Sequence, residues 1–202
     1  MWTLVPLGNP GPEYQDTRHN LGRLLLQRWM AERSLAPTPM KRFPSGTLYP
    51  LSPQLQALVP STYMNLSGEA CAQAAAVGLY PRRMVLLHDD KDLPLGLGRF
   101  RLNGSDGGHN GLRSVFELLG SQDIARLRLG IGPFQRPLAD FVLEPWTEPE
   151  WARLDSSLRC RERAASGQRM RGLFHDSSPG RWHGTGASRA CRGAFGARAL
   201  DA

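Results

Sequence analysis

The chain has few cysteines and no long hydrophobic run, and each shortage excludes a class of protein. Its three cysteines, Cys71, Cys160 and Cys191, are too few and too irregularly spaced for a disulfide framework or a zinc site. No apolar run reaches the roughly 18 residues that a membrane-spanning helix needs. The first residues, MWTLVPLGNPG, lack the basic start and the cleavage site of a signal peptide. We therefore expect a cytoplasmic protein with no membrane partner.

The formal net charge of +7 is concentrated at one end of the chain. Residues 159–202 contain nine Arg against three acidic residues, a net charge of +6. Residues 1–158 carry a net charge of only +1. Binding of RNA by residues 1–158 would therefore depend on local groups of side chains rather than on overall charge.

Length and composition predict one folded domain and a tail. A chain of 202 residues, 41% of them hydrophobic, is long enough for a single domain with a substantial core. We place that domain at residues 1–158. Residues 159–202 are rich in Arg and Gly and show no sustained periodicity, which predicts disorder. An altered reading frame of a GC-rich gene would give the same composition.

Strand-like and helix-like segments alternate along residues 1–158. Apolar runs typical of strands lie at residues 2–7, 47–51, 55–59, 84–87, 99–102 and 125–131. Helical patterns lie at residues 21–33, 67–79, 109–119 and 147–158. The alternation predicts an α/β domain with a sheet between helical layers. Because the close pair at 47–59 reads as a hairpin, we expect the sheet to be mixed.

Four polar loops follow predicted strands, at residues 8–20, 60–68, 88–92 and 103–111. Ligands of α/β proteins bind beyond the carboxyl ends of the strands. The first loop holds His19, which could act as a general base or simply cap the following helix. The third holds Asp89, a carboxylate that could orient an imidazole or bind a metal. His109 is a possible further ligand, but it lies beside Asn110 in a Gly-rich turn, and we expect no metal site.

Other polar residues in these loops have two interpretations each. Asn65 could hold a substrate carbonyl or cap a helix. The Gly-rich loop at residues 103–111 could present backbone N–H groups to an anion, or be a plain turn. Alternation puts Arg99 with Arg101 on one strand face, and Arg126 with Arg128 on another. Such pairs could grip a phosphate or form a solvated face.

Five segments together resemble the bacterial-type peptidyl-tRNA hydrolase family. They are GNPGPEYQDTRHNLG, VPSTYMNLSGEA, LLHDDKDLPLGLGRFRLNGSDGGHNGLRS, RLRLGIG and ADFVLEPW, in the order of the family and over most of residues 2–151. The resemblance implies a mixed, twisted sheet flanked by helices. It also implies hydrolysis of the ester that joins a peptide to the 3′ end of tRNA, which recycles the tRNA. Ester hydrolysis by an activated water requires no metal or organic cofactor, and we expect a monomer.

The resemblance also assigns roles to residues. His19 would be the catalytic base, Asp89 would orient it, and Asn9 would lie beside it and select N-blocked substrates. Six further residues would contact the substrate. Asn65 and Asn110 would bind the peptide main chain or position the water, and Tyr14 and Tyr63 would line the site near the terminal nucleotide and peptide. Arg101 and Arg128 would bind a tRNA phosphate.

Departures from the family and two other functions accompany this prediction. Pro6 stands where the family usually has Gly, which predicts an irregular first strand because proline cannot donate a ladder hydrogen bond. The family's terminal helix is not recognisable after about Leu158. One alternative is an RNA-binding relative without hydrolysis, against which the intact set of Asn9, His19 and Asp89 argues. Another is a small-molecule hydrolase or phosphorylase on a similar fold, whose activity would not depend on the tRNA.

Overall fold

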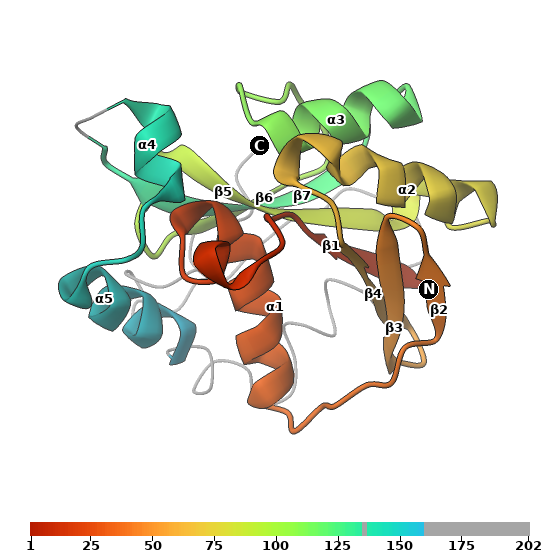
Figure 1. Cartoon of the computed structure of the whole chain (residues 1–202), viewed down its shortest axis with the longest axis horizontal. Coiled ribbons are helices and arrows are strands. Elements are labelled where there is room, and N and C mark those ends of the chain that lie inside the picture. Colours follow the sequence, from red (N-terminus) through yellow and green to blue (C-terminus); the bar gives the residue numbers. More distant parts are fainter. Residues whose placement is uncertain (135–136, 160–202) are drawn as a thin grey trace, which may run out of the picture.

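The computed structural model describes residues 1–134 and 137–159, which form a seven-stranded mixed sheet with helices on both faces (Figure 1). The strand order is β2-β3-β4-β1-β5-β7-β6. The central strands β4, β1, β5 and β7 are parallel, and β2, β3 and β6 run antiparallel to their neighbours at the two edges. The strands are β1 (Trp2–Pro6), β2 (Lys41–Phe43), β3 (Gly46–Ser52), β4 (Leu55–Pro60), β5 (Met84–Pro94), β6 (Gly98–Arg101) and β7 (Ala125–Gly132). The predicted α/β class and mixed sheet are confirmed.

Two helical layers cover the sheet. The helices are α1 (Leu21–Ala31), α2 (Ser67–Ala76), α3 (Asn110–Leu119), α4 (Leu138–Leu143) and α5 (Glu148–Arg159). Helices α2 and α3 lie on one face, and α1 and α5 on the other (Figure 1). The first layer buries Cys71, Leu112 and Phe116 against the sheet, and α1 packs Leu26 against the opposite face. A third apolar cluster joins α1 to α4 and α5 through Leu25, Phe141 and Leu154.

Strand β1 stays regular as far as Pro6, so the predicted irregularity is wrong. Pro6 pairs with Leu87 of β5, and the next residue, Leu7, donates its N–H to the Leu87 carbonyl at 2.9 Å. Backbone N–H groups alternate in direction along a strand. The N–H of Leu7 points to β5, so the backbone nitrogen of Pro6 faces β4. The pairing of β4 with β1 has already ended at Leu4. The missing proline N–H therefore costs no ladder hydrogen bond.

Other differences concern element boundaries. Strand β5 continues to Pro94, although the polar stretch at residues 88–92 predicted a loop. The short elements β2 and α4 were not predicted. None of the helices among the described residues has the length and apolar character to cross a bilayer. The predicted tail lies outside the described residues except for Arg159, where α5 ends.

Candidate active site

The side chain of His19 is directed to the carboxylate of Asp89 by the loop that joins β1 to α1. His19 occupies the middle of a 3₁₀ turn, Arg18–Asn20, immediately before α1. Its Nδ1 lies 2.8 Å from Asp89 Oδ1. Helix α1 can start this close to β5 because Gly22 has no side chain: a Cβ there would lie 2.3 Å from the Leu87 carbonyl oxygen. His19 does not cap α1, so the capping interpretation is wrong.

Asp89 is the hub of the site. It lies within β5, where it pairs with Leu129 of β7, and its side chain is 4% exposed. The same Oδ1 that contacts His19 also lies 3.0 Å from Nε2 of His109. The two imidazole rings lie close together, with centroids 4.8 Å apart. One buried carboxylate oxygen thus binds two imidazoles.

The backbone of α3 fixes the tautomer of His109. Its Nδ1 accepts the N–H groups of Gly111 and Leu112, at 3.1 and 3.3 Å, as the N-cap of the helix. A ring nitrogen that accepts carries no proton, so the proton of neutral His109 is on Nε2, which donates to Asp89. Protonation of Nδ1 would break the cap. His109 therefore donates from Nε2 to Asp89 while its Nδ1 caps α3, a role that the sequence analysis did not predict.

His19 has no such constraint. Its Nδ1 donates to Asp89, which leaves a lone pair on Nε2. Burial alone would lower the pKa of His19, but the charge and hydrogen bond of Asp89 outweigh it and raise the pKa above its ordinary value. Burial would likewise raise the pKa of Asp89, but His19 and His109 hold it well below its usual range. Asp89 is therefore a carboxylate wherever His19 changes charge.

His88 lies behind this pair. Its Nδ1 donates to the Asp89 carbonyl at 2.8 Å, and its ring lies edge-on to His109 with centroids 5.0 Å apart. Burial and the neighbouring His109 lower the pKa of His88 to about 3. His88 therefore stays neutral, and its ring supports His109 from behind.

Asn9 lies near the start of the same loop that carries His19. Its Oδ1 accepts the backbone N–H of Met64 at 2.8 Å, so its Nδ2 group is left to donate to a ligand. Asn20 locks the loop, because it accepts from the backbone N–H of Asn9 at 2.7 Å and donates to its carbonyl at 3.0 Å. The Met64 contact carries Asn9 to the turn that holds Tyr63 and Asn65.

Tyr14 and Tyr63 meet edge-to-face, with ring centroids 6.2 Å apart. Tyr63 is 52% exposed, so this pair offers an aromatic surface beside the loop. Asn65 follows in the 3₁₀ turn Met64–Leu66 and is exposed. It does not cap α2, so the capping interpretation is wrong for Asn65 as well.

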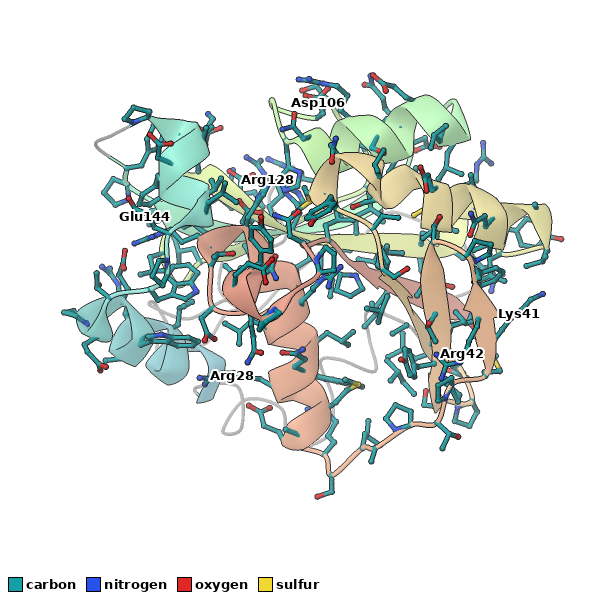
Figure 2. The ribbon with its side chains drawn as sticks, in the orientation of Figure 1. Arg28, Lys41, Arg42, Asp106, Arg128 and Glu144 are labelled. Atoms are coloured by element: carbon teal, nitrogen blue, oxygen red, sulfur yellow. The ribbon has the colours of Figure 1, made fainter. Side chains whose placement is uncertain are left out.

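A pocket of about 620 Å³ opens beside the imidazoles. It is bounded by β5, β7, α4 and the loop between β6 and α3, and Figure 2 labels two of its lining residues, Arg128 and Asp106. The predicted site residues that line it are His19, Asp89, Asn110, Arg101 and Arg128. The structure therefore joins these five in one pocket and places Asn9, Tyr14, Tyr63 and Asn65 on the adjoining loops.

Three arginines line the same pocket, and we call them the arginine wall: Arg101, Arg126 and Arg128. Arg128 donates from Nε to Asp90 Oδ2, which leaves its terminal NH₂ groups available. Arg126 is 4% exposed and donates to the Ser105 carbonyl at 2.7 Å, so it supports the Gly-rich loop. Burial and the charge of Arg128 lower the pKa of Arg126. Arg101 pairs with Arg126 across β6 and β7 and reaches the same pocket.

Among the described residues, the ligand atoms of His19, Asp89 and His109 lie within 4.8 Å of one another, close enough to consider a metal ion. Those atoms, however, are engaged in hydrogen bonds to one another. A metal on Nε2 of His109 would displace its proton, and the proton could not move to Nδ1 without loss of the α3 cap. The arrangement favours proton transfer over metal binding.

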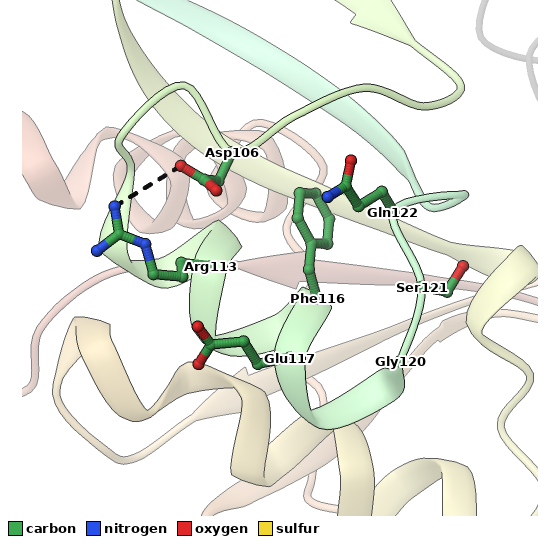
Figure 3. A pocket seen from close by; sticks show the side chains of 7 residues that line it. All are labelled: Asp106, Arg113, Phe116, Glu117, Gly120, Ser121 and Gln122. Atoms are coloured by element: carbon green, nitrogen blue, oxygen red, sulfur yellow. Dashed lines mark ion pairs between the residues drawn. The ribbon is translucent and has the colours of Figure 1, made fainter.

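A second hollow, of about 380 Å³, lies along α3 (Figure 3). Its lining includes the Asp106–Arg113 pair, 3.9 Å apart, with Glu117 and Phe116. It contains no imidazole, so it is not the site of the chemistry described above.

Comparisons with known proteins agree with the geometry. A sequence model described as peptidyl-tRNA hydrolase matches residues 3–174. The peptidyl-tRNA hydrolase of Carboxydothermus hydrogenoformans is 42% identical over 163 residues, which cover 79% of this chain and 87% of the relative. That of Pseudomonas putida strain F1 is 41% identical over 162 residues, with 77% and 83% covered.

Solved structures give the same result. The crystal structure of peptidyl-tRNA hydrolase from Acinetobacter baumannii superposes with a TM-score of 0.69 at 28% identity, and the match covers 87% of this chain and 93% of the other. A family match over most of the chain, close relatives and a shared fold lead to one conclusion: the chain belongs to the peptidyl-tRNA hydrolase family.

Proposed function

We propose that this protein hydrolyses the ester between the peptide and the 3′ end of tRNA, with the Nε2 atom of His19 as the base. The observation that carries the assignment of the base is the asymmetric pair of imidazoles on Asp89. His109 is held in one tautomer by α3, whereas His19 directs a lone pair from a ring that lines the pocket. Of the two, His19 is the imidazole that can accept a proton from water.

The reaction proceeds by attack of water on the ester carbonyl carbon. As the O–C bond forms, the water proton moves to Nε2 of His19, and Asp89 stabilises the resulting imidazolium. The tetrahedral intermediate then expels the ribose oxygen of the terminal nucleotide, which takes the proton back from His19. The carboxylic acid of the peptide loses its remaining proton to solvent, so the products are a peptide carboxylate and free tRNA, and His19 returns to its neutral state.

Amide donors are available for the developing oxyanion and the peptide. The Nδ2 group of Asn9 is available because its Oδ1 is engaged by the Met64 N–H. Asn110 is exposed at the start of α3 and lines the pocket. Preorganised donors of this kind stabilise a tetrahedral oxyanion. We assign Asn9 and Asn110 to this role, and Asn65 to the peptide main chain.

The arginine wall suits the tRNA. The free terminal groups of Arg128, with Arg101 on the neighbouring strand, present two cations to a phosphate, and the Tyr14–Tyr63 pair offers a stacking surface for a base. Because His19, Asp89 and His109 all come from one chain, we propose that the monomer is active. We also propose that it acts in the cytoplasm.

His19→Ala decides the assignment of the base. Turnover of N-acetyl-aminoacyl-tRNA should fall by about two to four orders of magnitude, as for loss of a general base, while tRNA binding is retained. Near-normal turnover would exclude His19 as base. Binding without turnover in the unmodified protein would instead support a non-catalytic RNA-binding relative, for which the relatives named above, all hydrolases, give no support.

A comparison of two substrates tests the alternative that the protein is a hydrolase of small molecules. A simple peptidyl nucleoside ester has the reacting bond but lacks the tRNA phosphates. If the arginine wall contributes binding energy, the N-blocked tRNA should be the better substrate by KM. Equal efficiency on both substrates would show that the protein ignores the tRNA.

A further inference from the structure

Arg18, the residue before His19, has the most buried charged side chain of the loop that joins β1 to α1, at 1% exposure. It extends away from the pocket into the turn between α4 and α5. There its Nη1 donates to the carbonyls of Phe141, Glu144 and Pro145 at 3.1 to 3.3 Å. Its guanidinium carbon also lies 4.3 Å from the ring centroid of Phe141, so the cation packs on an aromatic face. The turn is built around this guanidinium.

A carboxylate completes the site of the guanidinium. Nη2 of Arg18 contacts both oxygens of Glu150, at 2.8 and 2.7 Å. Glu150 lies in the first turn of α5, where it also accepts from the N–H and the hydroxyl of Thr147, both at 2.8 Å. Burial would raise the pKa of Glu150, but the hydrogen bonds from Arg18 and Thr147 lower it. The Glu150 carboxylate is therefore held in position by Thr147 as well as by Arg18.

The backbones join at the same place. Arg18 donates its N–H to the Glu144 carbonyl at 3.3 Å, and Trp146 donates to the Asp16 carbonyl at 3.3 Å. Thr17 and Pro145 form an antiparallel bridge between these bonds. Glu144, labelled in Figure 2 at the turn between α4 and α5, thus lies against a segment more than 120 residues away. The side-chain and backbone contacts form one unit, which we call the Arg18 clamp.

His19 lies between two anchors. On one side the Arg18 clamp holds the preceding residue, and on the other Asn20 is bonded in both directions to Asn9. The imidazole makes its Asp89 contact at 2.8 Å from a turn of three residues, so a shift at either anchor changes that contact. Helix α4 also lines the pocket, through Leu138, Ala139 and Val142. One clamp therefore holds both the base and a wall of the pocket.

We propose that Arg18 is a positioning residue, which acts through the Glu150 carboxylate and the α4–α5 turn to hold His19 on Asp89. This inference rests on the proposed function, because it takes His19 as the base. It makes the α4–α5 segment part of the catalytic apparatus, although every residue assigned to the chemistry precedes residue 129.

Glu150→Gln tests the clamp with the smallest change in shape. The amide keeps one acceptor for Arg18 and for Thr147 but removes the charge and one oxygen from the bidentate pair. We expect kcat to fall by roughly tenfold to a hundredfold, the range that displacement of a catalytic group by about 1 Å produces, with KM for tRNA little changed. The acid limb of the pH profile should move to lower pH, because a His19 less firmly held on Asp89 loses the contact that raises its pKa. Glu148→Gln, the same change at an exposed residue of the same helical turn, is the matched control and should behave as wild type.

Chemical rescue supplies a second test. Arg18→Ala leaves a space lined by three carbonyls and the Glu150 carboxylate, a site shaped for a guanidinium ion. Methylguanidinium should restore part of kcat at concentrations far below those that denature proteins, and equal sodium chloride should not. If Arg18→Ala does not fold, Glu150→Gln decides alone.

The result that would overturn the proposal is a purely structural one. Folded Glu150→Gln would then melt at a lower temperature yet keep the wild-type kcat and pH limb. Failure of the proposed function is distinguishable, because it appears as retained turnover in His19→Ala, whatever the clamp variants do.

Discussion

Replacing Asp89 by Asn isolates the charge at the centre of the site. Asn has the shape of Asp, and its Oδ1 can still accept from Nδ1 of His19 and Nε2 of His109, which lie 2.8 and 3.0 Å from the carboxylate oxygen. What is lost is the negative charge opposite the imidazolium that forms as water is deprotonated. A hydrogen bond to a charged group contributes about 1.5–3 kcal/mol. If this free-energy contribution is lost only in the transition state, kcat falls about 10- to 150-fold.

The pH dependence gives the sign of the effect. In the wild-type site the pKa of His19 is raised, and in the proposed mechanism the neutral imidazole is the active form. The acid limb of kcat/KM should therefore lie above about pH 6.5, the ordinary pKa of histidine. Without the Asp89 charge, burial lowers the pKa of His19, so the limb should move below that value. Asp89→Asn is then slower on the plateau but keeps its plateau activity to lower pH.

A pH–rate profile on N-acetyl-aminoacyl-tRNA, for wild type, Asp89→Asn and His19→Ala together, checks both parts. Asp89→Asn should lose less activity than His19→Ala, because the base itself remains. An acid limb that stays in place, with a normal plateau, would refute the role of Asp89 as the group that sets the pKa of His19. An upward shift of the limb would contradict the sign of the argument.

Three further predictions follow from the geometry. His109→Asn should keep the α3 cap, because Asn is a good N-cap, but the Asn side chain is too short to reach Asp89. We expect a fall in kcat with a nearly unchanged melting temperature, and a normal kcat would exclude His109 from the site. Arg101→Ala and Arg128→Ala should raise KM for tRNA and reduce the slope of log KM against log salt by up to about 0.9 each, whereas an unchanged slope in both would make them surface arginines. Gly22→Ala should lower stability by about 1–3 kcal/mol in denaturant titrations, because its methyl group would lie 2.3 Å from the Leu87 oxygen, and an unchanged midpoint would show that α1 can shift freely.

Elements with strong local signals were predicted well. Helix α3 was expected at residues 109–119 and is found at Asn110–Leu119, because its apolar stripe is buried and Gly120 ends it in a left-handed conformation at φ 63°. Strand β5 was cut short because residues 88–92 are polar. Their backbone nonetheless pairs with β7 as far as Asp90, and the side chains of Asp89 and Asp90 contact residues of distant segments. Polarity alone therefore misplaced the end of the strand.

Five of the nine residues that the family resemblance named line one pocket, but few of their contacts were predicted. The family resemblance predicted that Asp89 orients His19, and the structure places Nδ1 of His19 2.8 Å from Asp89 Oδ1. It gave no role to His109, because a histidine in a Gly-rich turn has no local pattern that indicates where its ring points. The relevant signal was the position one residue before α3, where a ring nitrogen can accept backbone N–H groups. Arg18 left no signal at all, since its partners lie more than 120 residues away.

The two imidazoles on Asp89 differ in what each can do, although both donate to the same oxygen. Nδ1 of His109 accepts from two backbone N–H groups of α3, so a proton on that atom would break the cap of the helix. His19 has no backbone bond on its ring among those that the structure describes, so it alone of the pair can change charge at no cost to secondary structure. When His19 is neutral, His109 still stabilises the buried carboxylate, which therefore need not be protonated between turnovers. In the proposed mechanism, a helix cap thus determines which of two neighbouring histidines acts as the base.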